Sequence, residues 1–327
     1  MLRPGTIVPD VSKAENPVPS DASASSAVAT RLFGDLRCIG CGYNLRGLSI
    51  RSACPECGAS VRATLLAVVD PRAEELAPVR APRLMAWAFV FWSMGALVAG
   101  LAIWTLRIAD VIEIWADVTV PIELLGSAAV VAASASGAAS LALIRPHRRG
   151  HGGSAINKSW RAAFGVLCYA PLVYLLVQIL LRHDPMHGSP LDMFADPLDT
   201  ERLLLRVGVW AALGGVVWGL EPNVQQLRRR SLLMRTGRVT PQPMSALLAA
   251  LALAAVADLL VLAVSLMNGV AMDIAATLNL VAVAVGAFLL TLGIVALVLE
   301  GLRLRGAIVR RPVGVTDVFD PAKNTRP

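Results

Sequence analysis

Six long runs of apolar residues dominate the pattern of the chain. A helix needs about 20 predominantly apolar residues to cross the roughly 30 Å hydrocarbon core of a bilayer. Lipid offers no partners to backbone N–H and C=O groups, and a helix satisfies these groups within one segment. The pattern therefore predicts six spanning helices, over residues 84–106, 123–144, 162–181, 203–220, 244–267 and 274–299.

Lys and Arg concentrate in the segment before the first run, in every second loop between the runs, and in the segment after the sixth run. The intervening loops are mainly acidic, with Arg107, Arg182 and Arg202 as exceptions. Because Lys and Arg accumulate on the cytoplasmic side of a membrane protein, the alternation predicts six spans in a bacterial inner membrane with both termini in the cytosol. The basic residues of these segments are Arg72, Arg80 and Arg83; Arg145, Arg148, Arg149, Lys158 and Arg161; Arg228, Arg229, Arg230, Arg235 and Arg238; and Arg303, Arg305, Arg310 and Arg311.

The composition also indicates a membrane protein and excludes a soluble one. Apolar residues (AVILMFWYC) make up 56% of the 327 residues and charged residues 16%, with a mean hydropathy of +0.63. A soluble domain is about 45–50% apolar even with Gly counted, and about 25% charged. This chain has too few polar groups to coat a surface in water, and it is too apolar to be fibrous or mostly disordered.

The net charge of +7 follows from the orientation of the loops and does not require nucleic-acid binding. Basic clusters next to a membrane are attracted to anionic lipids. The expected partners are therefore the lipid bilayer and, at the arginines between residues 228 and 238, its anionic head groups.

A polar region precedes the spans, and the chain divides into five predicted parts. Residues 1–33 are rich in Pro, Ser and Ala, a composition that cannot bury a core, and are expected to be a disordered tail. Residues 34–62 are expected to form a zinc ribbon, followed by a linker over 63–82. An all-α, six-helix transmembrane domain over 83–303 and a cytosolic tail over 304–327 complete the predicted fold.

Four of the five cysteines are arranged as two Cys-x-x-Cys pairs, Cys38 with Cys41 and Cys54 with Cys57. Each pair can direct two thiolates at one point, and two pairs complete the tetrahedron that zinc prefers. Two disulfides or an iron–sulfur cluster are the competing interpretations, and the predicted cytosolic location argues against disulfides. A site closed by four protein thiolates has no open position for water, so a structural role is expected and a catalytic one is not.

The region around the cysteines is too small to fold on its own apolar core. Tyr43, Leu45, Leu48 and Phe33 are the apolar side chains expected to cover the metal. Zinc would therefore supply the folding free energy, on the order of 10–16 kcal/mol in peptides.

The sequence CIGCGYNLRGL over 38–48, followed by CPECG over 54–58, resembles the zinc-ribbon head of multi-pass bacterial membrane proteins of unknown function. The resemblance covers residues 36–60. It implies a β-hairpin-like knuckle fold with the four cysteines as ligands, and it implies no activity for the helices. Gly42 and Gly58 follow the second cysteine of each pair and are expected to have left-handed backbones. Asn44 and Gly47 are expected to form a turn.

Asp258 is the main functional candidate within the membrane, because intramembrane acids often mark ion or proton paths. The alternative is a packing role, in which Asp258 is protonated or bonds Asn279 or Arg206 on a neighbouring helix. A proton path usually recruits several polar groups, so the packing role is favoured and Asp258→Asn is expected to have little effect. Pro171 is expected to kink the third span, and Cys168 to be a buried core thiol.

Two functions are therefore compatible with the sequence. In the first, the helices anchor a structural zinc ribbon that binds a protein partner or serves as an assembly module. In the second, the bundle is a small-solute or ion transporter that uses Asp258, Arg206 and Asn279. An enzyme is not indicated, because the metalloprotease, hydrolase and nucleotide-binding motifs are absent. A metal at His183, Asp184 and His187 is not expected, because Pro185 disrupts a regular helical face.

Overall fold

Contacts divide the chain into two compact units, which are described separately: a head (Met1–Glu74 with Val313–Pro327) and a bundle (Glu75–Pro312). The computed structural model describes residues 31–73, 76, 79–115, 122–144, 154–184, 199–235, 240–265, 272–310 and 312–320. The expected disordered tail lies outside the described residues as far as residue 30.

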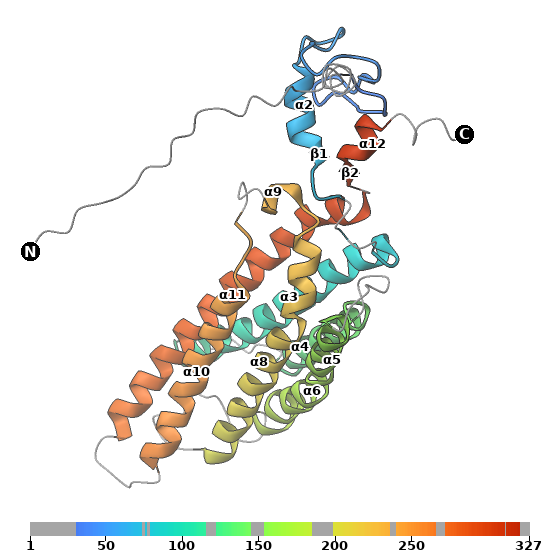
Figure 1. The fold of residues 1–327 in the computed structure, drawn as a ribbon. Helices are drawn as coiled ribbons and strands as arrows, with labels where there is room; N and C mark the ends of the chain where they lie inside the picture. The colour runs from blue at the N-terminus through green and yellow to red at the C-terminus, as the bar shows by residue number, and fades with distance from the viewer. Residues whose placement is uncertain are drawn as a thin grey trace, which may run out of the picture. The chain divides into compact units, whose positions relative to one another are not determined.

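The six predicted spans are confirmed as helices long and apolar enough to cross a membrane (Figure 1). The third span consists of three consecutive segments, α5, α6 and η2, and a short helix, α9, follows the fourth. The segments of the bundle are α3 (Pro82–Trp115), α4 (Ile122–Ala142), α5 (Ser154–Leu167), α6 (Tyr169–Val177), η2 (Gln178–His183), α8 (Thr200–Arg228), α9 (Leu232–Arg235), α10 (Met244–Ser265) and α11 (Met272–Val309).

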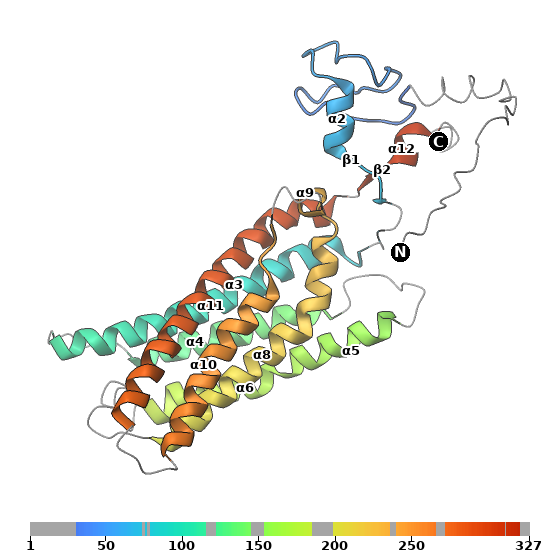
Figure 2. The same ribbon diagram turned by 60° about the vertical axis from the view of Figure 1, so that its left-hand side comes forward.

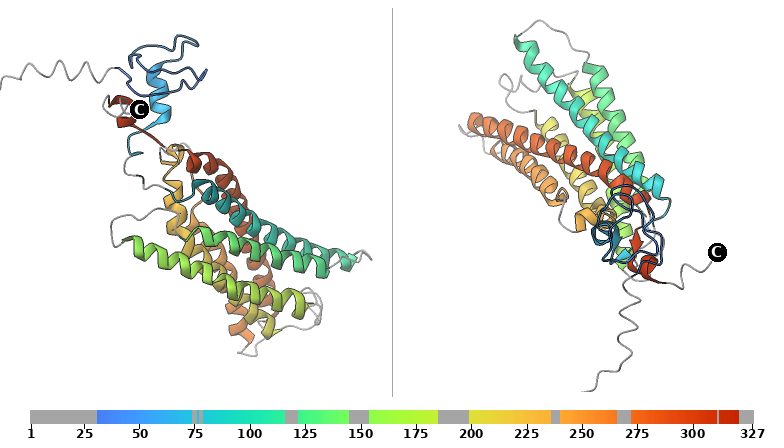
Figure 3. Two further views of the ribbon diagram at one scale, coloured as in Figure 1. Left: turned by 90° about the vertical axis from the view of Figure 1, so that its right-hand side faces the viewer. Right: turned by 90° about the horizontal axis from the view of Figure 1, so that it is seen from above.

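The spans pack as a ring that follows chain order. Helix α3 contacts α4, the segments of the third span contact α4 and α8, α8 contacts α10, and α10 contacts α11. The ring closes where α11 lies beside α3, as Figures 2 and 3 show from further directions. Short connections favour this arrangement, because consecutive elements are usually neighbours in space.

Several helices extend beyond the apolar runs that predicted them. The sixth run was expected to end at Leu299, before the first acidic residue, whereas α11 continues through Glu300 to Val309. The fourth run was expected to end at Leu220, whereas α8 continues through Pro222 to Arg228. Glu300 and Arg228 do not end these helices, because their side chains pair with each other across the two spans.

Pro222 is tolerated within α8 because another span supplies the missing donor. A proline lacks the N–H that would bond the carbonyl four residues earlier, which here belongs to Trp218. The guanidinium of Arg161 on α5 donates to that carbonyl oxygen at 2.8 Å. It also lies over the Trp218 ring, 4.1 Å from its centroid.

The third span is interrupted where Pro171 predicts a kink. Helix α5 ends at Leu167, whose carbonyl lies four residues before the proline, and α6 begins at Tyr169. Cys168 lies between them and is buried, as predicted. Tyr169 then joins three spans, because its hydroxyl accepts from the indole of Trp92 at 2.8 Å and lies 2.9 Å from the Ser136 hydroxyl.

Small residues allow the closest helix approaches. A Cβ atom placed on Gly219 of α8 would lie 2.5 Å from the Cα of Gly165 on α5. A Cβ on Gly95 of α3 would lie 2.9 Å from the carbonyl oxygen of Ala132 on α4. Such contacts are typical of membrane helices, which associate through close van der Waals packing at small residues.

The head is built from two distant parts of the chain. Its strands pair in parallel, with Val69 opposite Val313 and Asp70 opposite Gly314. The expected linker over 63–82 therefore contains most of a helix and a strand, and part of the expected cytosolic tail over 304–327 belongs to the head. The elements of the head are α2 (Val61–Val68), β1 (Val69–Asp70), β2 (Val313–Gly314) and α12 (Val315–Phe319).

The Gly219–Gly165 contact yields a first prediction. Gly219→Ala must push α8 away from α5 and should lower the free energy of unfolding by about 1–3 kcal/mol. Gly214→Ala on the same helix is the control, because its Cβ would meet no described heavy atom within 4 Å. That variant should be as stable as the parent or slightly more so, since Ala is the better helix former. Equal melting temperatures of the two variants in detergent would contradict the close crossing.

Candidate metal centre

Two Cys-x-x-Cys turns of the head share one hydrogen-bond pattern. In the first turn, the Cys38 amide donates to the Tyr43 carbonyl at 2.8 Å and the Gly42 amide donates to the Cys38 carbonyl at 2.9 Å. In the second turn, the amides of Cys54 and Gly58 make the equivalent bonds at 2.8 and 2.9 Å. The two turns are therefore one local structure used twice.

The glycines behave as predicted. Gly42 and Gly58 have φ values of +78° and +72°, in the left-handed region that favours glycine. Between the turns, the Asn44 side chain accepts from the Arg46 amide at 3.2 Å, and Gly47 has a φ of +84°. The predicted turn at Asn44 and Gly47 is confirmed.

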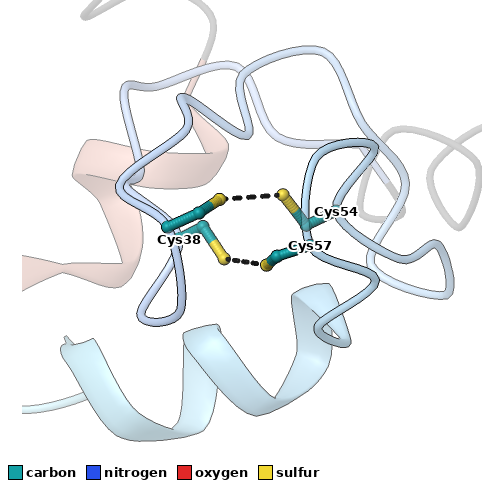
Figure 4. A group of neighbouring side chains, drawn as sticks. Cys38, Cys54 and Cys57 are labelled. Atoms are coloured by element: carbon teal, nitrogen blue, oxygen red, sulfur yellow. Dashed lines mark hydrogen bonds between the residues drawn. The ribbon is translucent and has the colours of Figure 1, made fainter.

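The sulfur atoms of the four cysteines converge and lie within 4.8 Å of one another. The Sγ atoms of Cys38 and Cys57 are 3.5 Å apart (Figure 4). Those of Cys41 and Cys54 are 3.6 Å apart. A tetrahedral ion with metal–sulfur bonds of about 2.3 Å separates its sulfur ligands by roughly 3.8 Å. The four side chains can therefore hold one metal ion.

Backbone amides favour the thiolate form of Cys38. Hydrogen bonds from the amides of Cys41 and Gly40 lower the pKa of the Cys38 thiol to about 6. The Gly40 nitrogen lies 3.4 Å from the sulfur. The thiolate is the form that binds metals, and within the same cluster the pKa of the Cys41 thiol is raised to about 12, so Cys38 is the thiol that loses its proton more readily.

The apolar cover of the cluster differs in part from the prediction. Leu45 is fully buried as expected, but the Tyr43 side chain is 41% exposed and Ile39 is 55% exposed, so both point away from the core. Leu48 packs against the core as expected, and two further buried residues, Leu32 and Val318, come from outside the expected ribbon. The buried core of the head consists of Leu32, Leu36, Cys38, Leu45, Cys54, Val61 and Val318.

The segment after the last span closes this core. The amides of Phe33 and Gly34 both donate to the carbonyl oxygen of Val318, at 2.9 and 3.0 Å. A Cβ atom on Gly34 would overlap the carbonyl oxygen of Asp317, so only glycine fits there. The Val318 side chain is fully buried. The four-cysteine unit therefore depends on residues nearly 300 positions away in the chain.

The sequence carried only a weak signal for this closure. Val313, Val318 and Phe319 are apolar residues in a segment assigned to a tail, and Asp317 accepts from the Gly314 amide at 3.0 Å to begin α12. A run of eight residues with this pattern does not show which surface it covers. The surface that this segment covers is identified only by the contacts of the folded head.

Asp258 lies fully buried within the bundle, surrounded by donors. Both its oxygens contact the Arg206 guanidinium, with Nε 3.2 Å from Oδ2 and Nη2 bonded to Oδ1. Trp210 Nε1 donates to Oδ2 at 2.8 Å, and Asn279 Nδ2 donates to Oδ1 at 2.8 Å. The structure therefore brings together the three residues singled out from the sequence and adds Trp210, which was missed.

The contact with Arg206 changes what is expected of Asp258. A guanidinium that contacts both carboxylate oxygens makes a charge-assisted, bidentate interaction, so of the two packing alternatives the structure shows the bond to Arg206. Asp258→Asn would leave the Arg206 charge without its counter-ion, which is strongly destabilising for a buried pair. The small effect expected from the sequence alone no longer follows.

A second buried ion pair joins α8 to α11. Arg228 Nε bonds Glu300 Oε1, and Arg228 Nη2 donates to Oε2 at 2.9 Å. The amide of Gln242 also donates to Oε2, at 3.2 Å. Arg228 was assigned to a loop and to head-group contact, but its side chain is only 9% exposed. Glu300 was missed because it lies just beyond the apolar run.

The opposite end of the bundle holds a third group of charges. Asp184 contacts Arg107 at 2.6 Å and Arg202 at 3.1 Å, which pairs two of the three arginines that broke the loop alternation. His183 Nε2 lies 2.5 Å from an oxygen of Asp199, the N-cap residue of α8. Asp184 is therefore engaged by two arginines, and His187 lies outside the described residues.

A scan against protein-family models, a search of curated proteins and a search of solved structures each found no match. The chemistry open to this chain is therefore inferred from its own side chains. The side chains in question are four thiol groups that can hold one metal ion and the buried ion pairs that connect the helices.

The closure of the head yields a second prediction. Val318→Asp places an unpaired carboxylate in the apolar core and should destabilise the head by roughly 3 kcal/mol or more, with loss of most bound metal. Val315→Asp is the control, because Val315 lies in the same short helix and is 43% exposed. Elemental analysis and limited proteolysis of the purified proteins should separate the two variants. Full metal content in the Val318→Asp protein would show that the C-terminal segment is dispensable.

Proposed function

We propose that this chain is a membrane-anchored assembly protein whose head is a structural zinc ribbon that binds a protein partner. Zinc is favoured because four cysteine thiolates at tetrahedral spacing are its preferred closed site. The arginine-rich segments support an orientation in a bacterial inner membrane with the head and both termini in the cytosol. There, reducing conditions keep the thiols available for a metal.

The observation that carries this proposal is the exposure of two large apolar side chains on the first cysteine turn. Ile39 and Tyr43 flank the metal ligand Cys41 and are not used by the core of the head. Aromatic and aliphatic anchors of this kind are enriched at protein interfaces. The metal would fix the turn rigidly, so that both side chains are presented in one conformation.

Transport through the bundle is the alternative, and the surroundings of Asp258 weigh against it. A transport carboxylate must exchange partners or charge during its cycle. Here both carboxylate oxygens of Asp258 accept hydrogen bonds, from Arg206, Trp210 and Asn279. This arrangement suits a fixed structural pair. The membrane domain is therefore proposed to anchor and position the head.

One purification tests zinc binding and partner binding together. The full chain, purified from native membranes in mild detergent, should carry about one zinc ion per chain and a co-purifying protein. Ile39→Ser with Tyr43→Ser should keep the zinc and lose most of the partner, because removing a central anchor costs about 2 kcal/mol or more. Cys38→Ser with Cys41→Ser should lose both.

Leu66→Ser provides the matched control, since Leu66 is an exposed apolar residue of the head on α2 rather than on the cysteine turn. It should keep zinc and partner. Iron in place of zinc, or no metal, would reject the zinc assignment. Unchanged partner recovery after the Ile39 and Tyr43 substitutions would reject the binding surface while leaving the metal centre intact.

A further inference from the structure

A cavity of about 260 Å³ lies at the end of the bundle that holds Arg228 of α8 and Arg303 of α11. Its walls come from α9, from the segment that leads into α10, and from α11. Met234, Pro241, Ala296 and Leu299 supply apolar surface, and Thr240 and Arg303 supply polar groups.

Glu300 and Gln242 also line the cavity, and the Glu300 charge there is already balanced. The Arg228 guanidinium contacts both carboxylate oxygens, and the Gln242 amide adds a third donor. Among the described residues of the lining, the remaining charged group is Arg303, which is exposed. The described lining is therefore partly apolar and carries one net positive charge, which suits an anion.

The pocket is continuous with a surface of α11 that is suited to lipid chains. Leu292, Val295, Leu299 and Leu302 are all exposed, and their spacing places them along one side of the helix. Leu299 belongs both to this stripe and to the wall of the pocket. A molecule with an anionic head and apolar tails would contact both surfaces at once.

We propose that this pocket binds the head group of an anionic glycerophospholipid. The phosphate pairs with Arg303, the Thr240 hydroxyl donates to it, and the acyl chains follow the exposed side of α11. Basic pockets between membrane helices are known to select anionic lipids by this chemistry. Pockets for drug-sized ligands measure about 300–1,000 Å³. A pocket of about 260 Å³ therefore holds a lipid head group while the acyl chains remain outside it.

This site is independent of the partner proposed for the head, because every residue that forms it belongs to the bundle. It also refines the expectation that arginines of this region contact anionic lipids. The contact is assigned to Arg303, and Arg228 instead serves to hold Glu300.

The test measures lipid binding to the full chain in detergent by thermal shift and by native mass spectrometry. The probes are dioleoyl-phosphatidylglycerol, dioleoyl-phosphatidylcholine and inorganic phosphate. Phosphatidylglycerol should raise the melting temperature and remain bound, and phosphatidylcholine should do so more weakly. Arg303→Gln should weaken phosphatidylglycerol binding about fivefold, the factor for one arginine–lipid contact.

Arg305→Gln is the matched control, because Arg305 lies two residues away on α11 but stacks on the Trp87 ring, 4.6 Å from its centroid. It should bind phosphatidylglycerol like the parent. Ala296→Phe fills the pocket without changing charge, and should abolish the shift even if Arg303→Gln proves unstable. Equal binding of both lipids, equal losses in the two arginine variants, or inorganic phosphate acting as well as the lipid would overturn the proposal.

Discussion

A charge buried between apolar helices needs a partner beside it, and this constraint organises the bundle. Helix α8 carries Arg206 near one end and Arg228 at the other, each held by a carboxylate from the α10–α11 hairpin. The two arginines are separated by about 33 Å along an ideal helix, close to the roughly 30 Å thickness of the hydrocarbon core. Sliding the hairpin by one turn would break both pairs, so the charges fix its register against α8.

The head meets a different constraint, which is a shortage of apolar residues. About 40 residues around the cysteines cannot bury enough surface to be stable alone. The structure adds Val318 and its neighbours from beyond the last span to the apolar core of the head. The four thiol groups provide a site where a bound metal ion can add to the stability of the head. Segments that precede and follow the membrane domain in the chain therefore form one small unit.

Features set by local pattern were predictable from the sequence. The six spans follow from the length of the apolar runs, and the left-handed Gly42 and Gly58 follow from their place after a cysteine pair. Arg206 and Asn279, two of the three partners of Asp258, were identified because charged and polar residues are rare within spans.

Features set by tertiary contact were not predictable. Tyr43 was expected in the core and is exposed, whereas Val318, from beyond the last span, is fully buried in that core. Glu300 was overlooked because an acid beside an apolar run normally ends it. Its partner Arg228 is 72 residues away in the chain, a pairing that no local pattern encodes.

The most direct test of the account is a double-mutant cycle on Arg206 and Asp258, measured as free energies of unfolding in mixed detergent. Arg206→Met and Asp258→Leu should each cost about 3–5 kcal/mol, because each leaves the other member of the buried pair without its partner. The double variant should be more stable than their sum implies by about 2 kcal/mol or more. Strictly additive costs would contradict an ion pair that holds the hairpin in register.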